Sequence, residues 1–189
     1  TYSVPMAGTR ERALDAAVAL VGEGGMRALT HARVDAAAAL PPGSTSNWFR
    51  TRAALVTGLI DWIAEQERID LSAALGAGAP LDVDGLIDTI TRAVELQTGP
   101  HALRTRARLT LFLDASPLAQ TPLHAQRLTF EEGLRAAAQR LGMPDADAAA
   151  RTLLACGNGL IMHRLTVAPG APVRPVVERA VHGCLSAPA

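Results

Sequence analysis

The sequence predicts an all-α protein, and three observations support this fold class. Apolar residues recur at the spacing of one helix face in segment after segment, as at Leu14, Val18 and Val21. Glycine and proline punctuate these segments, and no segment shows the alternation of a half-buried strand. Hydrophobic residues make up 49% of the 189-residue chain and charged residues 19%, which is typical of a globular protein with a sizeable core.

Caps and breaks divide the chain into about nine helices. Thr30 is placed to cap a short helix, Thr51 is placed to cap a long one, and the sequence GAGAP at 76–80 indicates a linker. We expect helices at about 9–24, 30–38, 43–50, 52–75, 82–98, 101–115, 121–141, 145–167 and 172–186. The resulting parts are a three-helix N-terminal domain (1–51), a connector helix (52–75) and a larger helical domain (76–189).

The formal net charge is zero, but the charges are unevenly distributed. All 18 basic residues are arginine; residues 1–55 hold six of them against four acidic residues, and the remaining residues hold twelve against fourteen. A mildly basic N-terminal part is compatible with nucleic-acid contact at that end. We find no signal-peptide pattern and no apolar run near the ~18 residues of a membrane span, so we expect a cytoplasmic protein with no membrane partner.

The segment LPPGSTSNWFRTRAAL, residues 40–55, interrupts the Ala- and Leu-rich pattern on both sides. On a helical wheel of residues 43–50, the face expected to pack inward holds Thr45, Trp48 and Phe49. The opposite face is small and polar and holds Gly43, Ser46, Asn47 and Arg50, with Ser44 at its edge. A helix of two turns is too short to be stable alone, so stability does not explain this face. A close fit to a partner such as a DNA major groove would explain it.

The neighbouring elements complete a helix-turn-helix pattern, in which a short helix and a tight turn present a second short helix to DNA. Asn47 can pair with adenine through its side-chain amide, and the serines can donate or accept at several bases. Arg33, Arg50 and Arg52 lie near helix ends, where they can neutralise phosphates. The structural alternative for Ser44, Ser46 and Asn47 is an ordinary polar turn.

Residues 9–55 resemble the N-terminal domain of the TetR family of bacterial transcriptional regulators. The resemblance is carried by TRERALDAAVALVGEGG, GMRALTHARVDAAAAL, GSTSNWF and TRAAL, which follow one another without a gap. The rest of the chain resembles the family only in its helical architecture. Three residues depart from the family pattern: Ala39 stands where the turn usually has glycine, and Pro41 and Pro42 replace the usual cap and polar residue.

This resemblance implies a helix-turn-helix DNA-binding domain followed by a helical ligand-binding and dimerisation bundle. It implies three partners: a double-stranded DNA operator, a small-molecule inducer and a second copy of the chain. Phosphate contacts are implied for Thr30, Arg33, Trp48 and Arg52, and base contacts for Gly43, Ser44, Ser46 and Asn47. For Trp48, packing behind the short helix is the alternative. The implied dimer contact is the last two long helices, about 145–167 and 172–186.

The candidate ligand contacts are Trp62, Arg106, Phe112, Asn158 and His163. For the aromatic residues the alternative is core packing, and for the polar residues it is an exposed or internally bonded position. Asn158 lies between two glycines in a helix that we expect to be buried. A buried amide needs hydrogen-bond partners, and an inducer could supply them.

We therefore expect a homodimeric DNA-binding regulator, a repressor that a small-molecule ligand releases from its operator. The alternative is a helical small-molecule-binding or adaptor protein without sequence-specific DNA binding, which the Pro41-Pro42 pair keeps open. The sequence has no nucleophile elbow, no phosphate-binding glycine loop and no His, Cys and acid cluster at metal spacing. We accordingly expect no enzymatic activity, cofactor or metal.

Overall fold

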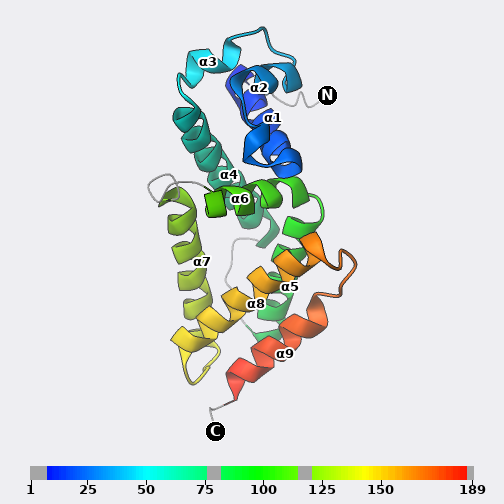
Figure 1. The fold of residues 1–189 in the computed structure, drawn as a ribbon. Coiled ribbons are helices and arrows are strands. Elements are labelled where there is room, and N and C mark those ends of the chain that lie inside the picture. Colours follow the sequence, from blue (N-terminus) through cyan, green and yellow to red (C-terminus); the bar gives the residue numbers. More distant parts are fainter. Residues whose placement is uncertain (1–7, 76–81, 115–120, 187–189) are drawn as a thin grey trace, which may run out of the picture. The chain divides into compact units, whose positions relative to one another are not determined.

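The computed structural model describes residues 8–75, 82–114 and 121–186, and within these ranges its regular elements are all helices. They are α1 (Thr9–Gly24), a 3-10 turn η1 (Met26–Ala28), α2 (His31–Ala37), α3 (Ser44–Trp48), α4 (Arg52–Leu75), α5 (Val83–Thr98), α6 (Ala102–Asp114), α7 (Thr121–Arg140), α8 (Ala146–Thr166) and α9 (Arg174–Leu185). Figure 1 shows their order along the chain. The predicted all-α class is confirmed, whereas the linker expected at 76–80 lies outside the described residues.

The chain forms two compact units, and α4 contributes to both. The N-terminal unit takes in residues 1–66 and 103–123, and the C-terminal unit takes in residues 67–102 and 124–189. Almost all of α6 therefore packs with the first four helices, although it follows α5 in the chain.

The core of the N-terminal unit joins α1, α2, α4 and α6. Leu14 of α1 and Leu55 and Leu59 of α4 are fully buried, and Ala107 and Leu111 bring α6 into the same cluster. Each buried leucine side chain contributes about 1.5–3 kcal/mol to folding. This core gives the short helices α2 and α3 a rigid surface on which to pack.

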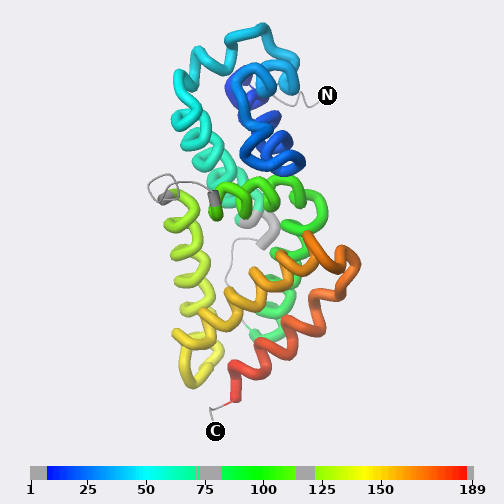
Figure 2. The backbone as a smooth tube through the Cα atoms, viewed as in Figure 1, coloured from blue at the N-terminus to red at the C-terminus, as the bar shows by residue number. Residues whose placement is uncertain are grey.

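In the C-terminal unit, α5, α8 and α9 contact one another, and Figure 2 shows α8 and α9 running in opposite directions. Two helices of this unit, α5 and α8, begin with acidic caps: Asp82 accepts a hydrogen bond from the Gly85 amide at 2.7 Å, and Asp145 accepts one from the Ala148 amide at 2.9 Å. These caps satisfy amide groups that the first turn of a helix leaves without partners.

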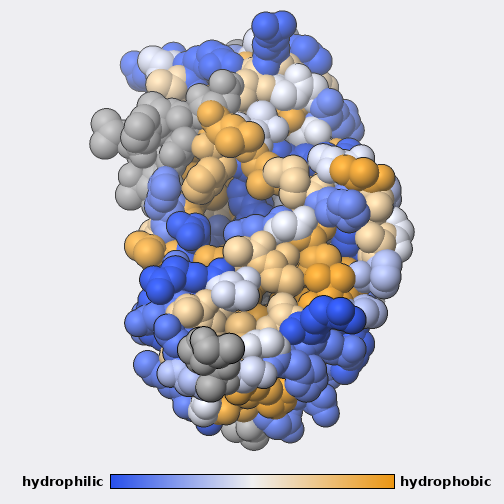
Figure 3. Space-filling view, turned by 60° about the horizontal axis from the view of Figure 1, so that its bottom comes forward, coloured by the Kyte–Doolittle hydropathy of each residue, from blue (hydrophilic) through white to orange (hydrophobic). Residues whose placement is uncertain are grey.

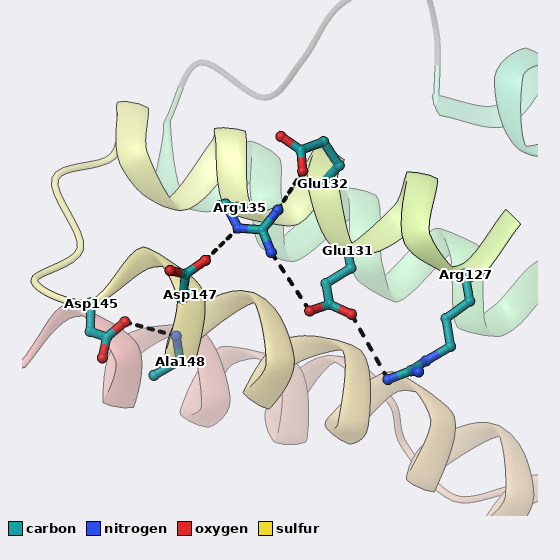
Figure 4. Close-up of polar contacts among 7 residues, drawn as sticks. All are labelled: Arg127, Glu131, Glu132, Arg135, Asp145, Asp147 and Ala148. Atoms are coloured by element: carbon teal, nitrogen blue, oxygen red, sulfur yellow. Dashed lines mark hydrogen bonds and ion pairs between the residues drawn. The ribbon is translucent and has the colours of Figure 1, made fainter. Parts of the chain in front are cut away.

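Ion pairs connect α7 to the start of α8 (Figure 4). The Arg135 guanidinium of α7 bonds Asp147 of α8 at 2.5 Å, and it also pairs with Glu131 at 3.7 Å and with Glu132. The hydrogen bond that Arg135 donates to Asp147, together with the surrounding carboxylates, raises the pKa of Arg135 above its usual value. Partly exposed pairs of this kind each contribute little to stability.

Candidate nucleic-acid interface

Thr30 begins α2 as the sequence predicts. Its backbone is extended, with φ −134° and ψ 150°, and its hydroxyl oxygen accepts a hydrogen bond from the Arg33 amide at 3.3 Å. This geometry is that of an N-cap, which supplies a partner to an amide at the helix start. Thr30 is exposed, so its remaining hydrogen-bonding capacity faces solvent.

A tight turn links α2 to α3, and Ala39 lies at its centre in a left-handed conformation with φ +50°. The Leu40 amide donates to the Asp35 carbonyl oxygen at 2.8 Å, and the Ala39 amide donates to the Ala36 carbonyl oxygen at 3.2 Å. These two bonds form a Schellman motif, which usually has glycine at the left-handed position. The departure of Ala39 from the family pattern therefore falls on a backbone that favours glycine.

The two prolines form the rest of the turn without disturbing α3. Both are exposed, and the Pro41 carbonyl oxygen accepts from the Ser44 amide at 3.1 Å and from its hydroxyl at 2.6 Å. The Ser44 hydroxyl, a candidate base contact, thus already has an acceptor within the turn. Gly43 follows the prolines at φ +88° and is exposed.

The side chains of α3 divide between a buried and an exposed face. Thr45 is fully buried and Phe49, just after the helix, is 5% exposed, whereas Ser46 and Asn47 are exposed. The predicted separation of a small polar face from an inward face is therefore confirmed for these four residues. One residue differs: Trp48 is 38% exposed.

The expectation that Trp48 packs behind the helix is wrong. The wheel assumed helical backbone as far as Arg50, but α3 ends at Trp48 and Phe49 leaves the helix with φ −124° and ψ 88°. Phe49 turns inward at that point, and Trp48 is left partly at the surface. Its indole N–H is a hydrogen-bond donor.

Several arginines of the N-terminal unit bond within the unit. Arg12 donates to the Ala38 carbonyl oxygen at 2.7 Å, and Arg52 donates to the Met26 carbonyl oxygen at 2.7 Å. The Arg10 guanidinium lies 5.4 Å from the centre of the Phe49 ring. These side chains remain exposed and bring positive charge to the surface of the N-terminal unit.

The candidate ligand contacts are divided between the two units. Trp62, Arg106 and Phe112 belong to the N-terminal unit, and Asn158 and His163 belong to the C-terminal unit. The Trp62 indole donates to Asp15 at 2.9 Å, Phe112 packs against the core of its unit, and Arg106 is exposed.

The expectation that Asn158 is buried is wrong: both it and His163 are exposed on α8. The buried face of α8 is formed instead by Leu153, Leu160 and Ile161. Because residues 158 and 160 are about 200° apart around a helix, Asn158 faces away from that side. The glycines on either side of Asn158 are likewise not among the buried residues of α8.

Comparison with known protein families gives the deciding observation. Residues 81–187 match the family described as the tetracyclin repressor-like C-terminal domain, which covers more than half of the chain. The chain belongs to the TetR family of transcriptional regulators. No curated protein sequence matches this TetR-family chain.

Solved structures similar to this TetR-family protein include three that span nearly its whole length. A transcriptional regulator from Rhodococcus sp. RHA1 is 19% identical, with a TM-score of 0.76, over 96% of this chain and 100% of its own. A TetR-family member from Streptomyces coelicolor A3 is 23% identical, with a TM-score of 0.73, over 95% and 99%. The regulator FadR from Bacillus subtilis, in complex with stearoyl-CoA, is 14% identical, with a TM-score of 0.69, over 93% and 97%. This likeness concerns the fold.

The two comparisons cover different extents of the TetR-family chain. The family match begins at residue 81, beyond α1, α2 and α3, whereas the solved structures span 93–96% of the chain.

Within the helices described, none is both long and apolar enough to cross a membrane.

The sequence did not point to Asp35, the most buried carboxylate of the helix-turn-helix, which is 4% exposed. Its Oδ2 accepts from the Gly43 amide at 2.8 Å, and its Oδ1 accepts from the Thr45 amide at 2.8 Å and the Thr45 hydroxyl at 2.5 Å. Burial alone would raise the pKa of Asp35, but these hydrogen bonds and the nearby His31 lower it below its usual value. A single acid in the Ala-rich stretch RVDAAAAL was the available signal.

Proposed function

We propose that this TetR-family protein is a homodimeric repressor that reads an operator with α3 and releases it when a small molecule binds. The observation that carries the proposal is the division of α3: Thr45 and Phe49 anchor it in the N-terminal unit, while Ser46 and Asn47 are exposed. Such a helix presents small polar groups to a partner, and a DNA major groove admits it.

Each exposed residue of this surface has a distinct role in the proposal. The Asn47 amide can pair with both edge atoms of an adenine, and the Ser46 hydroxyl can donate or accept at several bases. Arg33 and the Trp48 indole contact phosphates on either side, and Arg52 adds positive charge beside them. Contacts to phosphate position the helix, whereas contacts to bases select the sequence.

Dimerisation through α8 and α9 would place two reading helices on one face of DNA, about 34–36 Å apart for adjacent half-sites. Support comes from apolar side chains exposed on these helices: Met162 at 44%, Val167, just after α8, at 74% and Val176 at 45%. Figure 3 shows apolar surface lying between hydrophilic stretches on the face that it draws. A regulator of this kind acts in the bacterial cytoplasm.

The inducer is proposed to bind the helical part that follows residue 76, with α4 carrying the change to the DNA-reading part at 1–51. The stearoyl-CoA bound to FadR from Bacillus subtilis supports a small-molecule ligand in a protein of this fold. Of the candidate contacts, Arg106 and Phe112 lie on α6 in that part, whereas Trp62 lies on α4 itself. The ligand must bind the DNA-free state more tightly to release the operator.

Selection of bound sequences from random DNA tests the proposal and yields the operator. Asn47→Ala should then cost about 1–3 kcal/mol at that operator and relax the preference at one base. Arg33→Ala should weaken operator and random DNA alike and lower the salt slope by about 1. Arg92→Ala, at an exposed position of α5 in the C-terminal unit, is the matched control and should leave both affinities unchanged.

Wild-type protein that shows no salt-dependent affinity for any DNA would overturn the repressor proposal. The protein would then be a helical ligand-binding or adaptor protein, the alternative that the proline pair raised. The geometry of the turn weakens that alternative, because Pro41 accepts two hydrogen bonds from Ser44 and α3 forms directly after it.

A further inference from the structure

Helix α3 is too short to be stable without contacts from the rest of the N-terminal unit. It spans five residues, Ser44–Trp48, and a helix of this length is unstable in isolation. Its N-cap residue is Gly43, which has no side chain to bond the first amides. Something outside α3 must therefore satisfy its amides and fix its direction.

Asp35 of α2 supplies the missing cap. Its two carboxylate oxygens accept from the amides of Gly43 and Thr45, both at 2.8 Å, and from the Thr45 hydroxyl. A carboxylate at a helix start is also favoured by the helix dipole. The carboxylate is 4% exposed, so it is enclosed by protein and does not itself reach a partner.

His31 bonds the opposite end of α3. Its Nε2 lies 2.6 Å from the carbonyl oxygen of Phe49, the C-cap residue of α3, and donates to it. His31 and Asp35 are four residues apart on α2, so they lie on one face of that helix. One face of α2 therefore bonds both ends of α3.

We propose that Asp35 and His31 form a polar clamp that sets the orientation of α3 and so determines operator selectivity without touching DNA. The inference rests on the proposed DNA binding. An apolar contact would allow α3 to slide or rotate, whereas hydrogen bonds at both ends fix one arrangement. A buried carboxylate is costly unless its hydrogen bonds are made, so any displaced α3 is disfavoured.

The test measures affinity for the selected operator and for random DNA of equal length. Asp35→Asn keeps the size of the side chain but replaces one acceptor by an NH2 group, so one amide of α3 loses its partner. Operator affinity should fall roughly tenfold, while random-DNA affinity and its salt slope stay unchanged. Asp82→Asn makes the same substitution at the cap of α5 and, as the matched control, should leave both affinities unchanged.

Three further variants, at Thr45 and His31, keep the test decisive if Asp35→Asn does not fold. Thr45→Val removes only the hydroxyl that Asp35 accepts and should lower selectivity in the same direction. His31→Ala should also lower it, whereas His31→Gln restores an N–H donor for the Phe49 carbonyl and should recover it.

The clamp is overturned if these variants keep wild-type selectivity, or if they weaken operator and random DNA by the same factor. The second result would mean that Asp35 and His31 act on stability alone. Failure of the proposed function looks different, because the wild-type protein itself would then bind no DNA.

Discussion

Ala39 provides the sharpest stability prediction, because it combines a left-handed backbone with an exposed side chain. Its φ of +50° is imposed by the Schellman bonds of the turn, in which Leu40 and Ala39 donate to the last carbonyls of α2. The side chain packs in no buried cluster. Ala39→Gly therefore changes the backbone preference and little else.

The expected magnitude is a difference of two terms. An L-residue other than glycine costs about 1–2 kcal/mol in the left-handed region, and glycine avoids that strain. Glycine also makes the unfolded chain more flexible, which costs about 0.4–1 kcal/mol. Ala39→Gly should thus raise the free energy of unfolding of the N-terminal unit by about 1 kcal/mol.

Urea unfolding followed by tryptophan fluorescence is the suitable assay. The two tryptophans of the chain, Trp48 and Trp62, both belong to the N-terminal unit, so their emission reports on that unit. Ala36→Gly is the matched control, since Ala36 is exposed inside α2 and the same change there should destabilise by about 0.5–1 kcal/mol.

Opposite signs for the two alanine-to-glycine variants are therefore expected in one protein and one assay. If Ala39→Gly lowers the urea midpoint as Ala36→Gly does, the left-handed strain at Ala39 is not real and the reasoning fails. A change in the slope with urea would instead indicate an altered unfolded or native state.

Three further predictions use the same assay. Gly22→Ala should destabilise the N-terminal unit by about 1–3 kcal/mol, because its Cβ would lie 2.4 Å from the Leu103 carbonyl oxygen, a backbone atom that cannot rotate away. Thr30→Ala should cost about 1 kcal/mol by removing the cap of α2, and Thr30→Ser should retain most of it. The pKa of Asp35 in the folded protein lies below its ordinary 3.8, so the ionised carboxylate stabilises the fold above pH 3.8, and this contribution is lost as the pH falls through the folded-state pKa. In that acidic range, the free energy of unfolding should fall more steeply for the wild type than for Asp35→Asn.

The positions of the helices could be predicted because their signals are local. Thr51 was expected to cap a helix over 52–75, and α4 spans Arg52–Leu75 with the Thr51 hydroxyl accepting from the Ala54 amide at 3.1 Å. The helix-turn-helix was recognisable for the same reason, since cap, turn and small polar residues follow one another within the segment. The turn η1 was not predicted, because it carries no apolar repeat.

Contacts between helices could not be predicted in the same way. A wheel gives the relative directions of side chains, but it does not say which side meets a neighbour. Asn158 was assigned to a buried side that belongs to Leu160 and Ile161. Asp35 was overlooked because the donors that justify a buried carboxylate, Gly43 and Thr45, lie across a turn.

The arginines of the N-terminal unit show why charge and hydrogen bonding must be considered together. Arg12 and Arg52 donate to backbone carbonyls within the unit, which at first argues against phosphate contact. A guanidinium has five N–H donors, however, and the bonds to carbonyls use only some of them. Because these bonds already restrict the side chain, a phosphate contact would cost less side-chain conformational entropy. The internal bonds of these exposed arginines therefore leave donors over for the proposed phosphate contacts.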